Sequence, residues 1–194
     1  MTKLAAALAF LLPLVAQAAG EEAREAFPGF SLIPPAGEQW TLASRADNSI
    51  LWVRETGHPE RSFAFAVVAG QAPTSVRTQA ELVAFLRRLG DAPPPSPNLE
   101  LVTSTAEPVD GASDACARHD AVVRDKAAGT LLTVAGVTCL HPDYPGRMFD
   151  VQYSQRAGEE THEEALNLEG EALLKSFRFE QAPGDDDWSL AGGQ

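Results

Sequence analysis

Residues 114–144 read DACARHDAVVRDKAAGTLLTVAGVTCLHPDY and contain both cysteines of the chain, Cys116 and Cys139. Two apolar segments flank the short loop 126–129, which ends in a glycine suited to the left-handed backbone of a hairpin turn. The stretch therefore predicts an antiparallel β-hairpin. If the loop is centred between Ala127 and Ala128, the register places Cys116 directly opposite Cys139.

Three chemistries are open to these cysteines: a zinc site, a reactive thiol or a disulfide. The pattern Cys116-x-x-His119 with Cys139-x-His141 suggests zinc, which binds thiolates and imidazoles. On a strand, however, residues three apart point to opposite faces, so Cys116 and His119 cannot share a metal. Opposed residues of an antiparallel pair lie about 4.5 Å apart at Cα, within disulfide range. The register therefore favours a Cys116–Cys139 disulfide, predicts no metal, and sets His119 across from Gly136 on the other face.

The N-terminus has the features of a secretory signal peptide. A positive residue, Lys3, precedes an apolar run over 4–15, and Ala16-Gln17-Ala18 matches a cleavage site. We predict that residues 1–19 are removed and that the protein is periplasmic or secreted. No second long apolar run follows, so no membrane insertion is expected after cleavage. An exported chain with two cysteines is typical of a protein with one disulfide.

Charge and length limit the possible partners and the number of domains. The chain has 15 basic and 27 acidic residues, a net charge of −12, and loses Lys3 with the leader. Such an acidic protein repels phosphate backbones and anionic lipids, so we predict no nucleic-acid partner. The remaining length suits one domain, which we place at residues 20–180. Residues 181–194 form an acidic, glycine-rich segment that we expect to be a flexible tail.

The hydrophobic pattern predicts an α+β fold, a mostly antiparallel sheet covered by two main helices. The predicted order is four strands, a helix, four strands, a second helix and a last short strand. The helices are expected at 78–89, beginning at a Thr78/Glu81 capping box, and at 161–177. The strands are expected at 30–32, 40–42, 49–56, 62–70, 99–109, 114–125, 130–140, 147–156 and 177–179. The strand 62–70 is apolar on both faces, which predicts that it is covered on both sides. The second helix has a possible capping box, Thr161/Glu164, and an apolar stripe of Ala165, Leu168, Ala172 and Leu173. Gly90 is the expected left-handed residue after the first helix.

Two segments resemble a known superfamily. GFSLIPPAGEQWTL, residues 29–42, resembles the opening of PsbP-like domains. FDVQYSQR at 149–156, followed by a helix ending ALLKSFRF at 172–179, is similar to the way that superfamily closes. The resemblance implies an antiparallel sheet between helices, an α/β/α sandwich, and membership of a group whose proteins are mostly non-enzymatic accessory subunits. It transfers no functional residue, and the disulfide-linked hairpin is not a feature it supplies.

No motif for a nucleophile elbow, a phosphate-binding loop, a zinc protease or a dinucleotide site is present, so we predict no catalytic residue and no cofactor. We expect an exported binding or accessory protein of the bacterial cell envelope, whose partner is another envelope protein or assembly. Candidate binding residues are His141, Asp143 and Tyr144, in a loop that also suits a tight turn, and Tyr153. One alternative is a periplasmic hydrolase-type enzyme with a site near His141, Asp143 and Tyr144. Another is a structural envelope protein.

Overall fold

The computed structural model describes most of the predicted domain, namely residues 24–37, 39–58, 61–109, 115–144, 146–158 and 165–181. The predicted signal peptide, the Thr161/Glu164 capping box and all of the predicted tail except Gln181 lie outside the described residues. Neither described helix has the length and apolarity that a membrane span requires.

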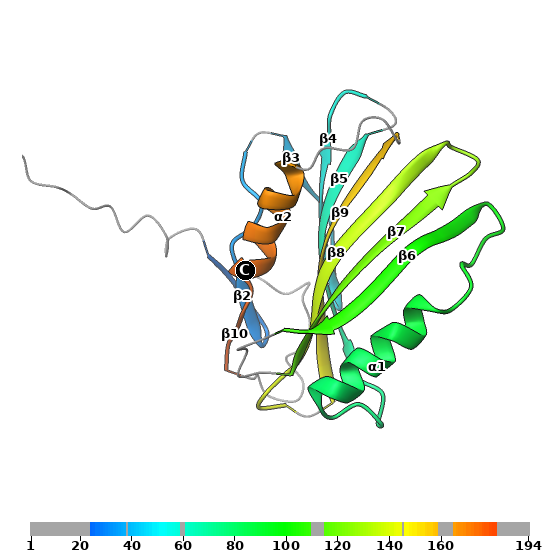
Figure 1. Ribbon diagram of the computed structural model, residues 1–194. Helices are drawn as coiled ribbons and strands as arrows, with labels where there is room; N and C mark the ends of the chain where they lie inside the picture. The colour runs from blue at the N-terminus through cyan, green and yellow to red at the C-terminus, as the bar shows by residue number, and fades with distance from the viewer. Residues whose placement is uncertain are drawn as a thin grey trace, which may run out of the picture.

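The main sheet is antiparallel throughout, as the sequence predicted. Its strand order is β3-β4-β5-β9-β8-β7-β6 (Figure 1). The strands, in chain order, are β3 (Trp40–Ala46), β4 (Ser49–Glu55), β5 (Ser62–Gln71), β6 (Leu99–Pro108), β7 (Cys116–Asp125), β8 (Thr130–Leu140) and β9 (Arg147–Gly158). A small second sheet pairs β1 (Glu25–Phe27) and β10 (Arg178–Phe179) with opposite edges of β2 (Phe30–Leu32), so it joins the two ends of the described chain.

The hairpin of β7 and β8 has the register that its loop predicted. Cys116 pairs with Cys139, His119 pairs with Gly136, and Asp125 pairs with Thr130 next to the loop. Gly129 adopts the expected left-handed backbone with φ of 66°. The two cysteines form a disulfide, which confirms the predicted cross-link.

The two helices lie on opposite faces of the sheet (Figure 1). Helix α1 (Gln79–Gly90) begins with the predicted Thr78/Glu81 capping box and packs Leu82 and Val83 against β7 and β8. Helix α2 (Ala165–Ser176) packs Leu173 and Leu174 against the other face. That second face carries the aromatic core, which includes Trp40, Trp52, Phe30, Phe63, Phe65 and Phe149.

The apolar stripe predicted for α2 was correct at Leu173, which is buried, but wrong at Leu168, which is 76% exposed, and at Ala172, which is also exposed. Gly170 and Leu174 face the sheet instead. The helix is therefore rotated relative to the prediction, because a polar residue, Glu169, also faces inward and breaks the apolar periodicity. Gly90 likewise is not left-handed but is the last residue of α1, with Asp91 as its C-cap.

Three expectations about strands also need correction. The short β1 was not predicted, and the strands predicted at 30–32 and 40–42 belong to different sheets, β2 to the small one and β3 to the main one. The β5 strand is central but is covered by a described helix on one face only, and Val68 on its other face is 39% exposed. Its small residues, Ala64 and Ala66, had made both faces look equally buried in the sequence.

Candidate functional site

The residues predicted as a binding site do not gather in one place. His141 is buried, only 3% exposed, with its ring against Phe179, and its Nδ1 accepts a hydrogen bond from the Asp143 backbone N–H at 3.2 Å. Asp143 itself is exposed, and Tyr144 is partly buried against the aromatic core. The contact between His141 and Asp143 is therefore a local hydrogen bond within a turn, from the Asp143 backbone to the His141 ring. None of these three residues lines a described pocket.

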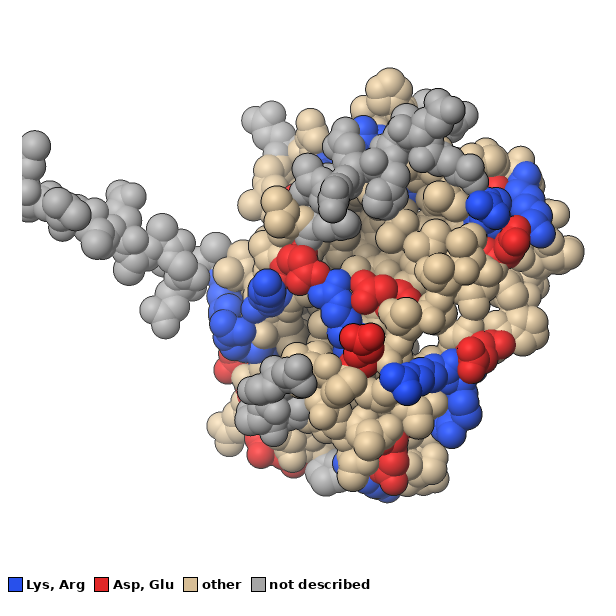
Figure 2. All heavy atoms as spheres, in the orientation of Figure 1, with Lys and Arg blue, Asp and Glu red and all other residues tan. Residues whose placement is uncertain are grey.

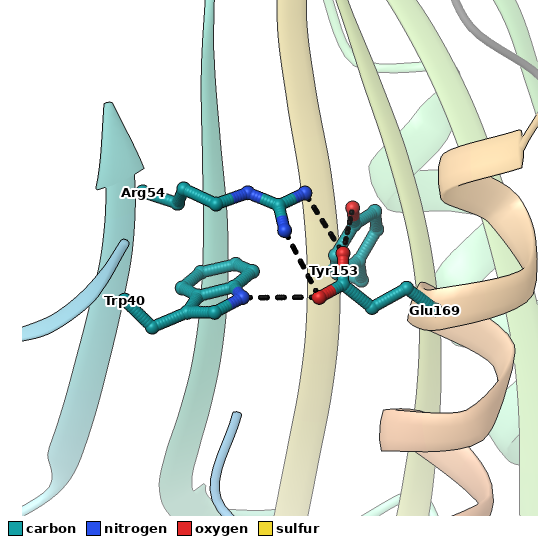
Figure 3. Close-up of polar contacts among 4 residues, drawn as sticks. All are labelled: Trp40, Arg54, Tyr153 and Glu169. Atoms are coloured by element: carbon teal, nitrogen blue, oxygen red, sulfur yellow. Dashed lines mark hydrogen bonds and ion pairs between the residues drawn. The ribbon is translucent and has the colours of Figure 1, made fainter. Parts of the chain in front are cut away.

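Tyr153 lies farther along β9, in a polar cluster that we call the α2 clamp: Trp40, Arg54, Tyr153 and Glu169 (Figure 3). Arg54 donates two hydrogen bonds to the Glu169 carboxylate, at 3.1 and 2.8 Å. The Trp40 indole N–H donates to Glu169 Oε1 at 3.0 Å, and the Tyr153 hydroxyl donates to Oε2 at 3.3 Å. The carboxylate from α2 is therefore bound by donors from three strands of the sheet.

The aromatic surroundings hold the clamp in place. The Arg54 guanidinium carbon lies 4.9 Å from the centre of the Trp40 ring and 4.6 Å from that of Phe63, within cation–π range of both. Burial, with the nearby Glu169 charge, raises the pKa of the Tyr153 hydroxyl, which stays protonated as a donor. Because each donor already has its acceptor, this cluster fixes α2 on the sheet and leaves little bonding capacity for a ligand.

Gly170 explains how α2 approaches so closely. A Cβ at this position would lie 2.6 Å from Cδ1 of Tyr153. The glycine costs about 1 kcal/mol in helix propensity relative to alanine, but it gives the Tyr153 ring room beneath the helix. The residue before it, Glu169, is thereby brought within reach of the sheet.

A histidine–carboxylate pair lies on the opposite face of the sheet. His119 Nε2 is 2.8 Å from Asp150 Oδ1, and the Thr138 hydroxyl donates to the same oxygen at 2.9 Å. Gly136 provides the predicted room, since a Cβ there would lie 2.4 Å from the His119 ring. His119 is thus partly exposed, on the face opposite Cys116 as the register predicted, and its ring is hydrogen-bonded to Asp150.

The largest described cavity lies near this pair, where α1 ends. We call it the α1 pocket; its volume is about 640 Å³, within the range typical of small-ligand sites. It lies between the chain that follows α1 and the outer strands β6, β7 and β8. Its lining is mostly apolar and comprises Leu89, Gly90, Ala92, Pro93, Pro94, Pro95, Leu99, Leu101, Ser104, Ala121, Val123, Asp125, Thr130, Leu132 and Arg156.

Local sequence produces the walls of this pocket. Three consecutive prolines, Pro93 to Pro95, hold the segment after α1 extended and stiff, because proline fixes φ and cannot continue a helix. Gly90 lets the end of α1 approach β6, where a Cβ would lie 2.1 Å from the Ser104 hydroxyl oxygen. Two large apolar side chains remain exposed at the pocket, Leu89 at 56% and Leu132 at 38%.

One end of the α1 pocket is polar but internally neutralised. Arg156 Nε donates to the Thr130 hydroxyl at 3.1 Å, and an Nη2 of Arg156 is 3.4 Å from Asp125 Oδ2. The other Asp125 oxygen accepts hydrogen bonds from two backbone N–H groups of the hairpin loop. The pocket can therefore accommodate an apolar group and offer hydrogen bonds at one end, without selecting for a net charge.

Sequence reasoning missed this pocket, although two signals pointed to it. These signals are the segment DAPPPSPN directly after α1 and Leu89 in the last turn of that helix. A large apolar residue in the last turn of a helix, followed at once by a rigid proline segment, is what leaves the apolar surface open here.

Charge is distributed unevenly between the described and remaining residues. The described residues include fourteen acidic and fourteen basic side chains, so the whole excess of −12 comes from the other segments. Figure 2 shows acidic and basic side chains lying next to one another on that side of the molecule. Among the described residues, no group of three or more His, Cys, Asp or Glu side chains is arranged to hold a metal ion.

Comparison with known proteins adds no relative. No model of a known protein family matches the chain, and no curated protein matches it significantly in sequence. The site must therefore be interpreted from its own geometry.

Proposed function

We propose that this protein is an exported binding or accessory protein of the cell envelope, which takes an uncharged apolar group of a partner protein into the α1 pocket. The observation that carries the proposal is the open, mostly apolar pocket of about 640 Å³ with Leu89 and Leu132 exposed at it. Exposed apolar surface in a concave site is typical of binding, because covering it removes that surface from water.

The chemistry of the pocket limits the occupant. Its charged residues, Asp125 and Arg156, already pair with each other, so a charged group would have to be desolvated without a free counter-charge. An apolar side chain with at most one hydrogen-bonding group fits better.

Bulges interrupt both edge strands of the main sheet, at Leu42/Ser44 in β3 and at Leu101/Thr103 in β6. Such irregular edges disfavour strand addition and leave the pocket as the better docking place.

The compartment and family belong to the same proposal. The disulfide and the predicted signal peptide support a periplasmic or secreted protein. The antiparallel sheet with a helix on each face is compatible with the PsbP-like resemblance, whose members are mostly accessory proteins. The hydrolase interpretation gains no support from geometry, since His141 is buried against phenylalanines and Asp143 points to solvent.

The proposal can be tested with a neutral apolar dye, N-phenyl-1-naphthylamine, whose fluorescence rises on transfer from water to an apolar site. We expect saturable binding to the wild-type protein and at least fivefold weaker binding to Leu89→Gln. The matched control is Leu168→Gln, which changes another exposed helix leucine, on α2 at the opposite face of the sheet, and should bind like wild type.

The partner is then sought with a photocrosslinking amino acid in the producing cell, placed at position 89 or at position 168. We expect one protein to crosslink at position 89 only, and the dye to compete with that purified protein for binding. Equal dye affinity for wild type and Leu89→Gln, or crosslinking that does not depend on position, would overturn the proposal.

A further inference from the structure

A second cavity lies on the other face of the β7–β8 hairpin, beside the end of α2. We call it the α2 pocket; its volume is about 420 Å³. Its floor and walls are apolar and include the disulfide, Val137, Leu174, Phe177 and Phe179. Nothing in the proposed function uses this cavity, and the inference that follows is independent of the α1 pocket.

The rim of the α2 pocket carries three cations and one carboxylate. Arg118 is neutralised, because it forms ion pairs with both Asp120 and Glu171. Lys175 is 78% exposed, with its ammonium 3.9 Å from Glu171, which is a weak contact. Within the described part of the chain, the Arg178 guanidinium bonds to backbone carbonyl oxygens only, those of Lys175 and Phe177. Lys175 and Arg178 therefore offer positive charge at the mouth of an apolar cavity.

The sequence that follows the pocket has the complementary chemistry. The described residues end at Gln181, two residues after Phe179, which lines the pocket. Residues 182–194 read APGDDDWSLAGGQ and contain three consecutive aspartates followed by Trp188 and Leu190. Pro183-Gly184 is a turn signal that favours reversal of the chain. The four Cα–Cα steps from Gln181 to Asp185 span at most about 14 Å, so Asp185 stays near β10, whose Arg178 and Phe179 line the pocket.

We infer that the α2 pocket is a binding site for an acidic, aromatic peptide segment, and that its occupant is the C-terminal segment 182–194 of the same chain. The aspartates face Lys175 and Arg178, and Trp188 covers the apolar floor. In this arrangement Lys175 and Arg178 gain carboxylate partners from the aspartates, and the Trp188 indole is removed from water.

The first test is zero-length crosslinking with a carbodiimide, which joins an ammonium to a carboxylate in direct contact. The chain has three lysines, Lys3 in the predicted leader, Lys126 at the hairpin loop and Lys175. We expect an intramolecular crosslink from Lys175 to one of Asp185 to Asp187, located by peptide mapping and lost in 1 M salt. Lys126 is the internal control, since it lies beside Glu100 and should not crosslink to the tail.

The second test uses a chain truncated after Gln181 and a synthetic peptide of residues 182–194, followed by calorimetry. We expect the peptide to bind the truncated chain, to bind the full chain at least tenfold more weakly because the site is occupied, and to lose tenfold in affinity for the truncated Lys175→Glu/Arg178→Glu variant. Lys126→Glu in the truncated chain should leave the affinity unchanged.

Equal binding of the peptide to full and truncated chains, or no binding to the truncated chain, would overturn the inference. So would crosslinks that form only between molecules, because the occupant would then be a second copy. Dye binding to the α1 pocket should be unaffected by the truncation, so failure of this inference and failure of the proposed function can be told apart.

Discussion

The two helices are attached to the sheet in different ways. Helix α2 is held by the α2 clamp, in which each polar group has a partner, and by a glycine that allows close approach. Helix α1 is held by hydrogen bonds from Gln79 and Arg87 to backbone carbonyl oxygens and by apolar residues such as Leu82, and apolar surface remains open where it ends. A cluster whose bonds are all made within the fold stabilises it, whereas open apolar surface is available to a partner. We therefore place the binding site at α1 and assign a structural role to the clamp.

The largest expected effect comes from breaking the clamp. Replacing Glu169 by alanine leaves Arg54 and the donors of Trp40 and Tyr153 without their acceptor, and Arg54 is only 14% exposed. We expect a loss of about 3 kcal/mol in the free energy of unfolding, measured by urea denaturation. The control is Glu100→Ala, which removes an exposed carboxylate paired with Arg124 and Lys126 and should have a much smaller effect. Similar losses in both variants would remove the distinction between the helices.

A pair of glycine substitutions sharpens the comparison. Alanine at position 170 would collide with the Tyr153 ring, and we expect a loss of about 2 kcal/mol even though alanine favours helix. Alanine at position 90 would meet the Ser104 hydroxyl, which can rotate away, and the Ser104 Cβ at 3.0 Å, which needs only a small shift, so we expect a smaller loss of about 0.5 kcal/mol. Thermal or urea unfolding of the two variants measures the difference, and a stabilised Gly170→Ala variant would show that α2 does not pack as described.

Sequence predicted the features that depend on neighbouring residues. The hairpin register followed from a four-residue loop and the α1 start from Thr78 and Glu81, because both are fixed by contacts within a short stretch. The clamp could not be predicted in this way, since Glu169 meets Arg54 and Trp40 from 115 and 129 residues away. The buried face of α2 was mispredicted because Glu169, a polar residue, faces inward and interrupts the apolar periodicity of the helix. The α1 pocket was missed because it consists of apolar residues that fail to be covered, which only the packing of distant strands decides.

A smaller effect is expected from the start of α1. Thr78→Ala removes the acceptor for the Glu81 backbone N–H, a bond of 3.3 Å, and should cost about 1 kcal/mol of stability. Circular dichroism during urea unfolding measures this loss. Thr78→Ser, which keeps the hydroxyl, is the matched control and should lose much less. If Thr78→Ala and Thr78→Ser have the same free energy of unfolding, the hydroxyl does not cap the helix.

The smallest effect is a dependence on pH. Hydrogen bonds from the Arg77 backbone N–H, then from the Thr78 hydroxyl, lower the pKa of Glu81 below its ordinary value. A carboxyl whose pKa is lowered by folding stabilises the fold above its unfolded pKa, and that contribution is lost as the pH falls through its folded pKa. The stability difference between wild type and Glu81→Gln should therefore be largest near neutral pH and shrink below the ordinary pKa of 4.5. A difference that is constant with pH would contradict the assignment.

The most direct test of the central claim is a methyl NMR titration of the protein with N-phenyl-1-naphthylamine. The account predicts that the resonances of Leu99, Leu101, Val123 and Leu132 shift on binding, because these residues line the α1 pocket. The methyl resonances of Leu173 and Leu174, which belong to α2 and pack against the opposite face of the sheet, should not shift. Shifts centred on α2, or no saturable shift at the α1 pocket, would contradict the account.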